Sequence, residues 1–215
     1  MEPSVALAIM QFSAYTAGIP LLAGIIGWSH LRRGQRYIMY LVIFSITIEL
    51  LALILGRLLH LPNLFLLHVF TVGQFYLLWS IFRQRLIPPF SRKIFSGLLI
   101  FFLLFAVASA IWLDGLFQFN AHARSVSAVL VILMCLTYYY QRLTRLDLED
   151  LESDPLFWIS TGSLVYFSGG LVMFIVSNYV AKNEGMSLTM WAVHAILNTF
   201  NYLFLTIALW VRPTN

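Results

Sequence analysis

The stretch Trp191–Tyr202 reads W-A-V-H-A-I-L-N-T-F-N-Y and lies inside the last long apolar segment of the chain. On an α-helix, which turns by about 100° per residue, Trp191, His194, Asn198 and Asn201 fall on one narrow face. A polar face of this kind is costly against hydrocarbon, so it is expected to look into the protein. The stretch therefore predicts a bundle in which other helices close around this one.

The composition is that of a membrane protein. Hydrophobic residues make up 60% of the 215 residues and charged residues only 10%, whereas a soluble domain carries roughly 25% charged residues. We expect an all-α, polytopic membrane protein with a single seven-helix domain over residues 1–215, in contact with a lipid bilayer. The predicted spans, each able to cross a core of about 30 Å, cover residues 5–29, 37–58, 63–83, 94–113, 124–144, 155–180 and 187–211.

The basic residues predict how the chain is oriented. One set of connections holds ten of them: Arg32, Arg33, Arg36, Arg83, Arg85, Arg92, Lys93, Arg142, Arg145 and Arg212. The opposite set holds only three: Arg57, Arg124 and Lys182. Since cytoplasmic loops are enriched in Lys and Arg, the N-terminus is predicted outside and the C-terminus in the cytoplasm, as in a bacterial inner (plasma) membrane. The net charge of +4 follows this topology, and no nucleic-acid partner is expected.

Three spans have distinctive compositions. Pro20 lies in the middle of the first span and is expected to kink it. The fourth span, residues 94–113, is almost purely apolar, and we expect it to face lipid and to take no part in function. The sixth span is rich in Gly and Ser, including Gly162 and Gly169, which favours close helix packing or a movable helix.

Glu49 is the only carboxylate predicted at membrane depth. Ser45, Glu49, Ala52 and Gly56 recur at helical spacing, and such small and polar stripes suit close helix contact. Ionisable residues are costly inside a membrane and commonly serve function, so Glu49 is interpreted as a proton or cation site or as a ligand anchor. The alternative is a protonated Glu that is hydrogen-bonded to a neighbouring helix.

Glu49, His68 and His194 form the predicted centre of a polar chamber. At 1.5 Å per residue they lie about 8–12 Å below the outer ends of their helices, in one layer. Two His and one carboxylate can bind a divalent transition metal, relay protons or hold a polar ligand. The alternative is a hydrogen-bond network that only joins the helices. Neutral groups that could complete a ligand site are Thr71, Gln74, Tyr166, Trp191, Asn198 and Asn201.

An acidic run occupies a loop that is predicted to be cytoplasmic. Residues 145–154 contain five acids, and the run is either a docking surface for a cytoplasmic signalling protein or a solvated helix extension. Ser153-Asp154-Pro155 resembles an N-cap followed by Pro at the first helical position.

Short matches between spans suggest an internal repeat. Leu41–Ser45 reads L-V-I-F-S and Leu164–Ser168 reads L-V-Y-F-S, while His68 and His194 each precede a Tyr-Leu pair by eight residues. The second and sixth spans run in the same direction, as do the third and seventh. We therefore predict a parallel three-helix duplication on either side of the fourth span, an arrangement that commonly places its binding site between the repeats.

The predicted topology resembles that of seven-helix sugar transporters, opsins and G-protein-coupled receptors, but at the level of topology only. Both lysines, Lys93 and Lys182, lie outside the spans, so retinal is not expected. Asn198-Thr-Phe-Asn-Tyr202 keeps the spacing of the receptor Asn-Pro-x-x-Tyr motif without its proline. Sugar transporters carry Pro-Gln pairs that are absent here, and membrane zinc hydrolases of the ceramidase type need a second histidine where Asn198 stands.

These features favour a sensor or receptor that binds a small ligand or metal ion in an outward-facing chamber and signals to a separate cytoplasmic protein. The alternatives are a proton-coupled transporter of small solutes, a metal-dependent intramembrane hydrolase, and a structural subunit. The sequence marks no catalytic nucleophile, and a homo-oligomer is compatible with it.

Overall fold

The computed structural model describes residues 2–86, 92–144, 151–180 and 184–212, and all regular structure within them is helical. The long helices are α1 (Pro3–Thr16), α2 (Gly18–Ile26), α3 (Arg33–Leu53), α4 (Phe65–Arg85), α5 (Arg92–Ala108), α6 (Ala121–Thr144), α7 (Pro155–Val180) and α8 (Glu184–Trp210). The short ones are η1 (Trp28–His30), η2 (Ile54–Leu58), η3 (Ser109–Leu113) and η4 (Leu151–Ser153). Seven helical segments of this part of the chain are long and apolar enough to cross a membrane. The predicted all-α, seven-span fold is confirmed, and the predicted spans overlap the observed ones.

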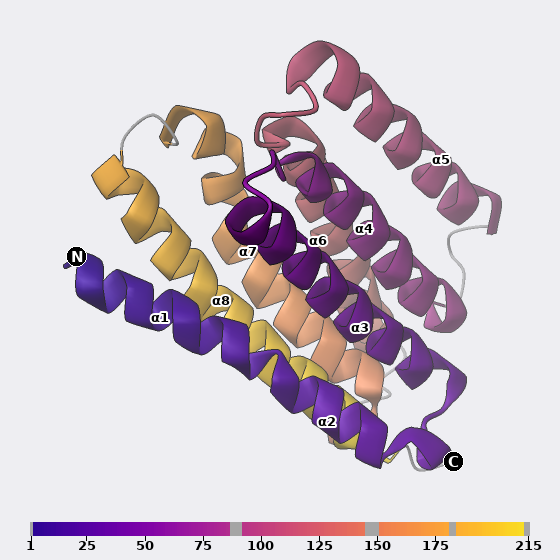
Figure 1. Ribbon diagram of the computed structural model, residues 1–215. Coiled ribbons are helices and arrows are strands. Elements are labelled where there is room, and N and C mark those ends of the chain that lie inside the picture. Colours follow the sequence, from indigo (N-terminus) through magenta and orange to yellow (C-terminus); the bar gives the residue numbers. More distant parts are fainter. Residues whose placement is uncertain (1, 87–91, 145–150, 181–183, 213–215) are drawn as a thin grey trace.

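The helices run up and down through one bundle. The helix α1 begins at one end, called here the N-terminal end, and α8 finishes at the opposite, C-terminal end (Figure 1). Large apolar side chains such as Leu50, Leu104 and Val172 are exposed on the outside of the bundle, which is compatible with contact to lipid. Which end faces the cytoplasm stays a prediction.

Six of the seven spans form the body of the bundle. The first span, α1 with α2, packs against α8; α3 packs against α4; α4 packs against α6; and α7 lies between α6 and α8. Further contacts join α2 to α3 and α3 to α8. The face of α8 that carries the polar stripe is thus surrounded by other helices, as expected.

The helix contacts agree with the predicted duplication. In a duplication the first, second and third spans correspond to the fifth, sixth and seventh. The α3–α4 contact then corresponds to α7–α8, and the α2–α3 contact corresponds to α6–α7. In the same way α1–α8 corresponds to α4–α6 and α3–α8 to α4–α7, and all of these contacts are present. The contact pattern is therefore compatible with two parallel three-helix units, and the duplication itself stays a prediction.

The fourth span, α5 with η3, lies outside this arrangement (Figure 1). It is the least buried of the seven spans and packs on α4 and α6. Phe102 packs at a tilt against Phe75 of α4 with ring centroids 4.0 Å apart, and the Trp79 indole donates a hydrogen bond to the Phe95 carbonyl at 2.8 Å. The expected lipid-facing character of this span is consistent with this peripheral place.

The first span is interrupted at Ala17, where α1 gives way to α2. Pro20 explains the position of the break. Proline has no N–H to donate to the carbonyl four residues earlier, and its ring crowds that carbonyl. The carbonyl concerned belongs to Thr16, the last residue of α1.

Glycines of α7 allow α8 to approach closely. A Cβ atom at Gly162 would lie 2.6 Å from the Cβ of Phe204, and one at Gly169 would lie 2.9 Å from a methyl group of Leu197. Neither position has room for a larger residue without movement. The close packing predicted from the Gly-rich sixth span is therefore observed.

Two polar anchors lie towards the C-terminal end. Gln35, buried at the start of α3, donates hydrogen bonds to the carbonyls of Ala208 (3.0 Å) and Val211 (2.8 Å) at the end of α8. Asp154 caps α7 through a hydrogen bond from the Leu156 amide at 2.9 Å, and the helix begins at Pro155. The predicted N-cap is confirmed. The docking surface predicted at 145–154 lies mainly outside the described residues, which resume at 151.

Candidate functional site

A cavity of about 370 Å³ lies among six of the spans, in the half of the bundle towards the N-terminal end. Its size is within the range of about 300–1,000 Å³ that is usual for small-molecule sites. The polar or charged side chains that line it are Ser13, Ser45, Glu49, Asn63, Arg124, Tyr166, Trp191, His194, Asn198 and Tyr202, and the rest of the wall is apolar. The predicted polar chamber therefore exists.

Five of the predicted site residues form part of this wall. Glu49 comes from α3 and Tyr166 from α7, whereas Trp191, His194 and Asn198 come from successive turns of α8. Residues 191, 194 and 198 share a face because they are three and four positions apart. The helical stripe that first marked the site is thus one wall of the cavity.

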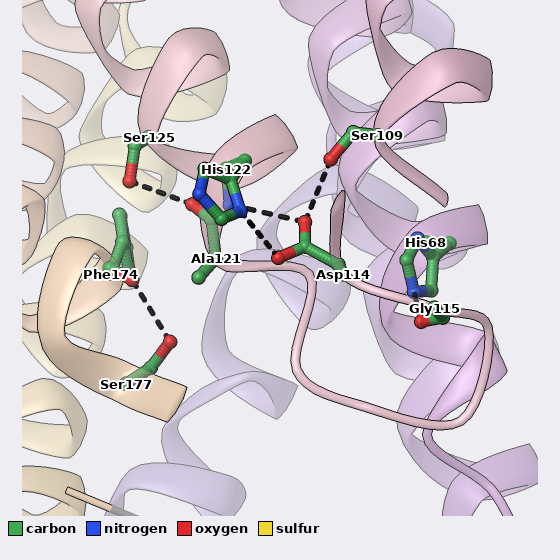
Figure 2. A network of polar contacts seen from close by, with 9 residues as sticks. All are labelled: His68, Ser109, Asp114, Gly115, Ala121, His122, Ser125, Phe174 and Ser177. Carbon is green, nitrogen blue, oxygen red and sulfur yellow. Dashed lines mark hydrogen bonds and ion pairs between the residues drawn. The ribbon is translucent and has the colours of Figure 1, made fainter. Parts of the chain in front are cut away.

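Four other predicted residues lie elsewhere. A ring nitrogen of His68 lies 3.2 Å from the carbonyl oxygen of Gly115, in the loop before α6 (Figure 2). Thr71 is buried and accepts a hydrogen bond from Asn120 at 2.6 Å, and Gln74 is buried on the same helix. None of these three lines the cavity.

Asn201, the fourth of these residues, is also absent from the cavity wall. It serves the contact between α8 and α7, since its Oδ1 atom would lie 3.3 Å from a Cβ at Gly162. The part of the α8 stripe that faces the cavity therefore ends near Asn198 and Tyr202.

The prediction that Glu49, His68 and His194 form one metal site is wrong. Glu49 and His194 line the cavity, but His68 belongs to the loop contact described above. Over residues 2–86, 92–144, 151–180 and 184–212, no group of three or more His, Cys, Asp and Glu side chains is placed to hold a metal ion. Equal depth along three helices did not bring the three side chains together, because α4 directs His68 towards the loop at 115.

Arg124 is the central cation of the cavity, although the sequence pattern placed it among the external loop charges. It stands in the first turn of α6. Its Nη2 atom donates a hydrogen bond to the Tyr166 hydroxyl at 2.9 Å and lies 3.4 Å from Nε2 of His194. The Tyr166 hydroxyl and His194 Nε2 are 3.0 Å apart. Three helices thus meet in one polar triangle.

The donors and acceptors of the triangle determine which atoms carry its protons. A guanidinium group has only donors, so Nε2 of His194 serves as the acceptor and its proton resides on Nδ1. The Tyr166 hydroxyl then accepts from Arg124 and donates to His194. In this arrangement every member of the triangle has a complementary partner, and Arg124 contributes the only formal charge.

Aromatic rings hold the Arg124 guanidinium in place. Its central carbon lies 4.5 Å from the centroid of Phe174 and 5.5 Å from that of Phe70, which are cation–π distances. Trp191 packs edge-on against His194 with centroids 5.6 Å apart. The charge is therefore positioned by ring faces and neutral acceptors, not by an acidic residue.

A second, much smaller cavity of about 20 Å³ adjoins the first. Both cavities are lined by Leu67, Phe119, Arg124, Trp191 and His194, so these five residues lie between them. The smaller cavity has enough volume for about one water molecule.

The loop that precedes α6 fixes the position of Arg124. The buried Asp114 accepts a hydrogen bond from Ser109 at 2.7 Å and contacts His122 Nδ1 at 2.7 Å (Figure 2). Asn120 donates to the Leu67 carbonyl at 2.9 Å as well as to Thr71. These bonds attach the first turn of α6 to α4 and to the end of the fourth span.

Asp114 of this loop contacts Ser109 of η3 and His122 of α6, but the three side chains do not have the arrangement of a hydrolase. In a catalytic triad the His accepts the proton of the nucleophilic Ser and the Asp orients the His. Here Asp114 lies between the other two, and the Ser109 hydroxyl donates directly to it. The geometry is that of a structural cap for the loop.

Arg124 was missed because a helix boundary was placed too late. The predicted fifth span started at 124, which made its Arg a loop residue, whereas α6 starts at Ala121. Asn120-Ala121-His122 did carry a signal, because Asn is a preferred N-cap. With the helix starting at residue 121, Arg124 belongs to the helix and lies within the bundle, not in the loop.

No protein-family model, curated protein or solved structure matches this chain. The fold of the described residues is an all-α bundle with seven helical segments long and apolar enough to cross a membrane, and the candidate site is the Arg124-containing cavity.

Proposed function

We propose that the protein is a membrane-embedded receptor or sensor that binds a small polar organic ligand in the 370 Å³ cavity and signals to a separate cytoplasmic protein. The observation that carries the proposal is a preformed cavity around one positioned guanidinium. Arg124 is held by Tyr166, His194 and two aromatic rings, and it has no acidic partner among the ion pairs of the described residues.

Energetics favour a ligand at this position over a purely structural role. A charged group at membrane depth is costly unless an opposite charge or several polar groups compensate it. A structural network would supply that compensation from the protein, as Asp154 does for Arg142 at 2.5 Å. At Arg124 the cavity leaves space for a ligand to supply it.

The proposed orientation follows from the basic loops and places the cavity towards the outside of a bacterial inner membrane. A ligand would then arrive from outside, and the helices would transmit its presence to the C-terminal end. The predicted docking segment 145–154 is the proposed contact for the cytoplasmic partner.

Native mass spectrometry of the purified chain, combined with thermal melting against a library of polar metabolite-sized compounds, tests the ligand proposal. We expect a retained or stabilising small molecule that is lost in Ala52→Phe, since Ala52 lines the cavity. Leu51→Phe is the matched control, because Leu51 is exposed one residue earlier on the same helix. If no compound is retained and none raises the melting temperature, the proposal fails.

One observation favours a proton-coupled transporter as the second candidate. Glu49 lines the cavity and forms no hydrogen bond or ion pair with any described residue. A transporter predicts that proteoliposomes take up the ligand along a proton gradient and that Glu49→Gln abolishes this uptake even at ligand concentrations that saturate the variant. A receptor predicts binding without uptake, so the two candidates give opposite results in the same vesicles.

A further inference from the structure

Two opposite charges face one cavity from different walls. Arg124 comes from α6, which packs against α4 and α7, and Glu49 comes from α3, which packs against α4 and α8. The two groups do not form an ion pair with one another in the described part of the chain. The cavity between them therefore presents a cation on one side and a carboxyl group on the other.

Arg124 keeps hydrogen-bonding capacity for a ligand. A guanidinium has five N–H donors, and the protein contacts of Arg124 use its Nη2 atom, towards Tyr166 and His194. Planar guanidinium groups favour two parallel hydrogen bonds to a carboxylate. A carboxylate is therefore an anionic group that fits this wall.

The wall that Glu49 lines suits a cation. Glu49 is half-buried, and Asn198 and Tyr202 line the same cavity. An ionised carboxylate only accepts hydrogen bonds, and an ammonium group only donates them. An ammonium group placed here would find a charged acceptor and neutral oxygen atoms around it.

We infer that the cavity takes a small zwitterion, with its carboxylate at Arg124 and its ammonium group at Glu49. The inference rests on the proposed function, since it names the class of ligand. An anion alone would compensate Arg124 and leave Glu49 uncompensated, and a cation alone would do the reverse. A zwitterion compensates both charges and adds no net charge to a low-dielectric site.

The rest of the wall limits the size and character of the ligand. The volume of about 370 Å³ lies near the lower end of the range for small-molecule sites. The apolar part of the lining includes Phe70 and Phe119, and Trp191 adds a further ring. A short hydrocarbon linker between the two charged groups would lie against these rings.

Isothermal titration calorimetry on the full chain in detergent tests the inference with a defined series. The probes are linear amino acids with one to five methylene groups between the charged groups, each paired with the carboxylic acid and the amine of equal length. We expect at least one amino acid to bind at least about tenfold more tightly than both of its partners.

Two variants test the contributions of Arg124 and Glu49 separately. Arg124→Gln should weaken the best amino acid at least about tenfold and weaken the matched acid equally. Glu49→Gln should weaken the amino acid by a similar factor but leave the acid unchanged. Arg57→Gln and Glu2→Gln are controls, because both residues are exposed towards the N-terminal end. If Arg124→Gln does not fold, Arg124→Lys retains the charge but loses the two parallel hydrogen bonds, and it should still weaken the amino acid and the matched acid alike.

The outcomes are distinguishable. If the acid or the amine binds as tightly as the amino acid, or if Glu49→Gln weakens both acid and amino acid alike, the zwitterion assignment is wrong. If the series does not bind but an uncharged compound from the library does, the assignment is wrong and the proposed function stands. If no compound of either set binds, both fail.

Discussion

The triangle of Arg124, Tyr166 and His194 permits a quantitative test through Tyr166→Phe. This change deletes one oxygen atom, which lies 2.9 Å from the Arg124 nitrogen and 3.0 Å from the His194 nitrogen. The ring remains, together with its edge-on contact to Phe167 at a centroid distance of 5.0 Å. The experiment therefore isolates the hydroxyl group.

The expected loss follows from the kind of bond removed. A hydrogen bond to a charged group contributes about 1.5–3 kcal/mol in soluble proteins, whereas hydrogen bonds between membrane helices average about 0.6 kcal/mol and reach about 1.7 kcal/mol. His194 retains its 3.4 Å contact with Arg124, so it is not left without a donor. We expect Tyr166→Phe to lower the free energy of unfolding by about 1–2 kcal/mol.

Reversible unfolding in mixed micelles, followed by tryptophan fluorescence, measures this change. The control is Tyr179→Phe on the same helix, because Tyr179 is exposed. Surface substitutions of this kind change stability by less than about 0.5 kcal/mol. If the two variants unfold at the same denaturant concentration, the triangle does not hold the helices together and its assignment as a positioned charge centre fails.

Two further predictions concern packing and capping. Gly162→Ala should destabilise the bundle by about 1–3 kcal/mol, because its new methyl group would lie 2.6 Å from Phe204. The control is Gly97→Ala on α5, which has no atom within 4 Å of the new methyl group and should be neutral or stabilising. Equal melting temperatures of the two variants would contradict this prediction. Asp154→Ala should lower the free energy of unfolding in mixed micelles by about 1–3 kcal/mol, because the helix cap and the ion pair are lost. The control Glu152→Ala should lower it by less than about 0.5 kcal/mol. A larger loss in Glu152→Ala than in Asp154→Ala would refute the role of the cap.

The sequence was sufficient for the fold because the bilayer restricts it strongly. Every backbone polar group in hydrocarbon must be satisfied within the protein, so apolar stretches of about 20 residues predict helices with few alternatives. The break near Pro20, the cap at Asp154 and the peripheral fourth span are all consequences of local chemistry. Each could be predicted without knowing how the helices pack.

The site could be predicted only in part, because helical periodicity gives directions around one axis and not the rotation of one helix against another. Trp191, His194 and Asn198 were predicted correctly as a shared surface, since all three are on α8. His68 was assigned to the same layer from its depth alone. The rotation of α4 turns it towards Gly115 instead.

The anchor at Gln35 has a mechanical consequence. Glu49 lies 14 residues from Gln35 along α3, and His194 lies 14 residues from Ala208 along α8, so each helix forms an arm of about 21 Å between the anchor and the cavity. With the two arms joined at Gln35, a change of about 1 Å in the spacing of Glu49 and His194 corresponds to a tilt of about 3° between the helices. A ligand that changed this spacing would therefore alter the angle between α3 and α8 about the Gln35 contact, and the proposed signal would reach the far end of the bundle as a rotation.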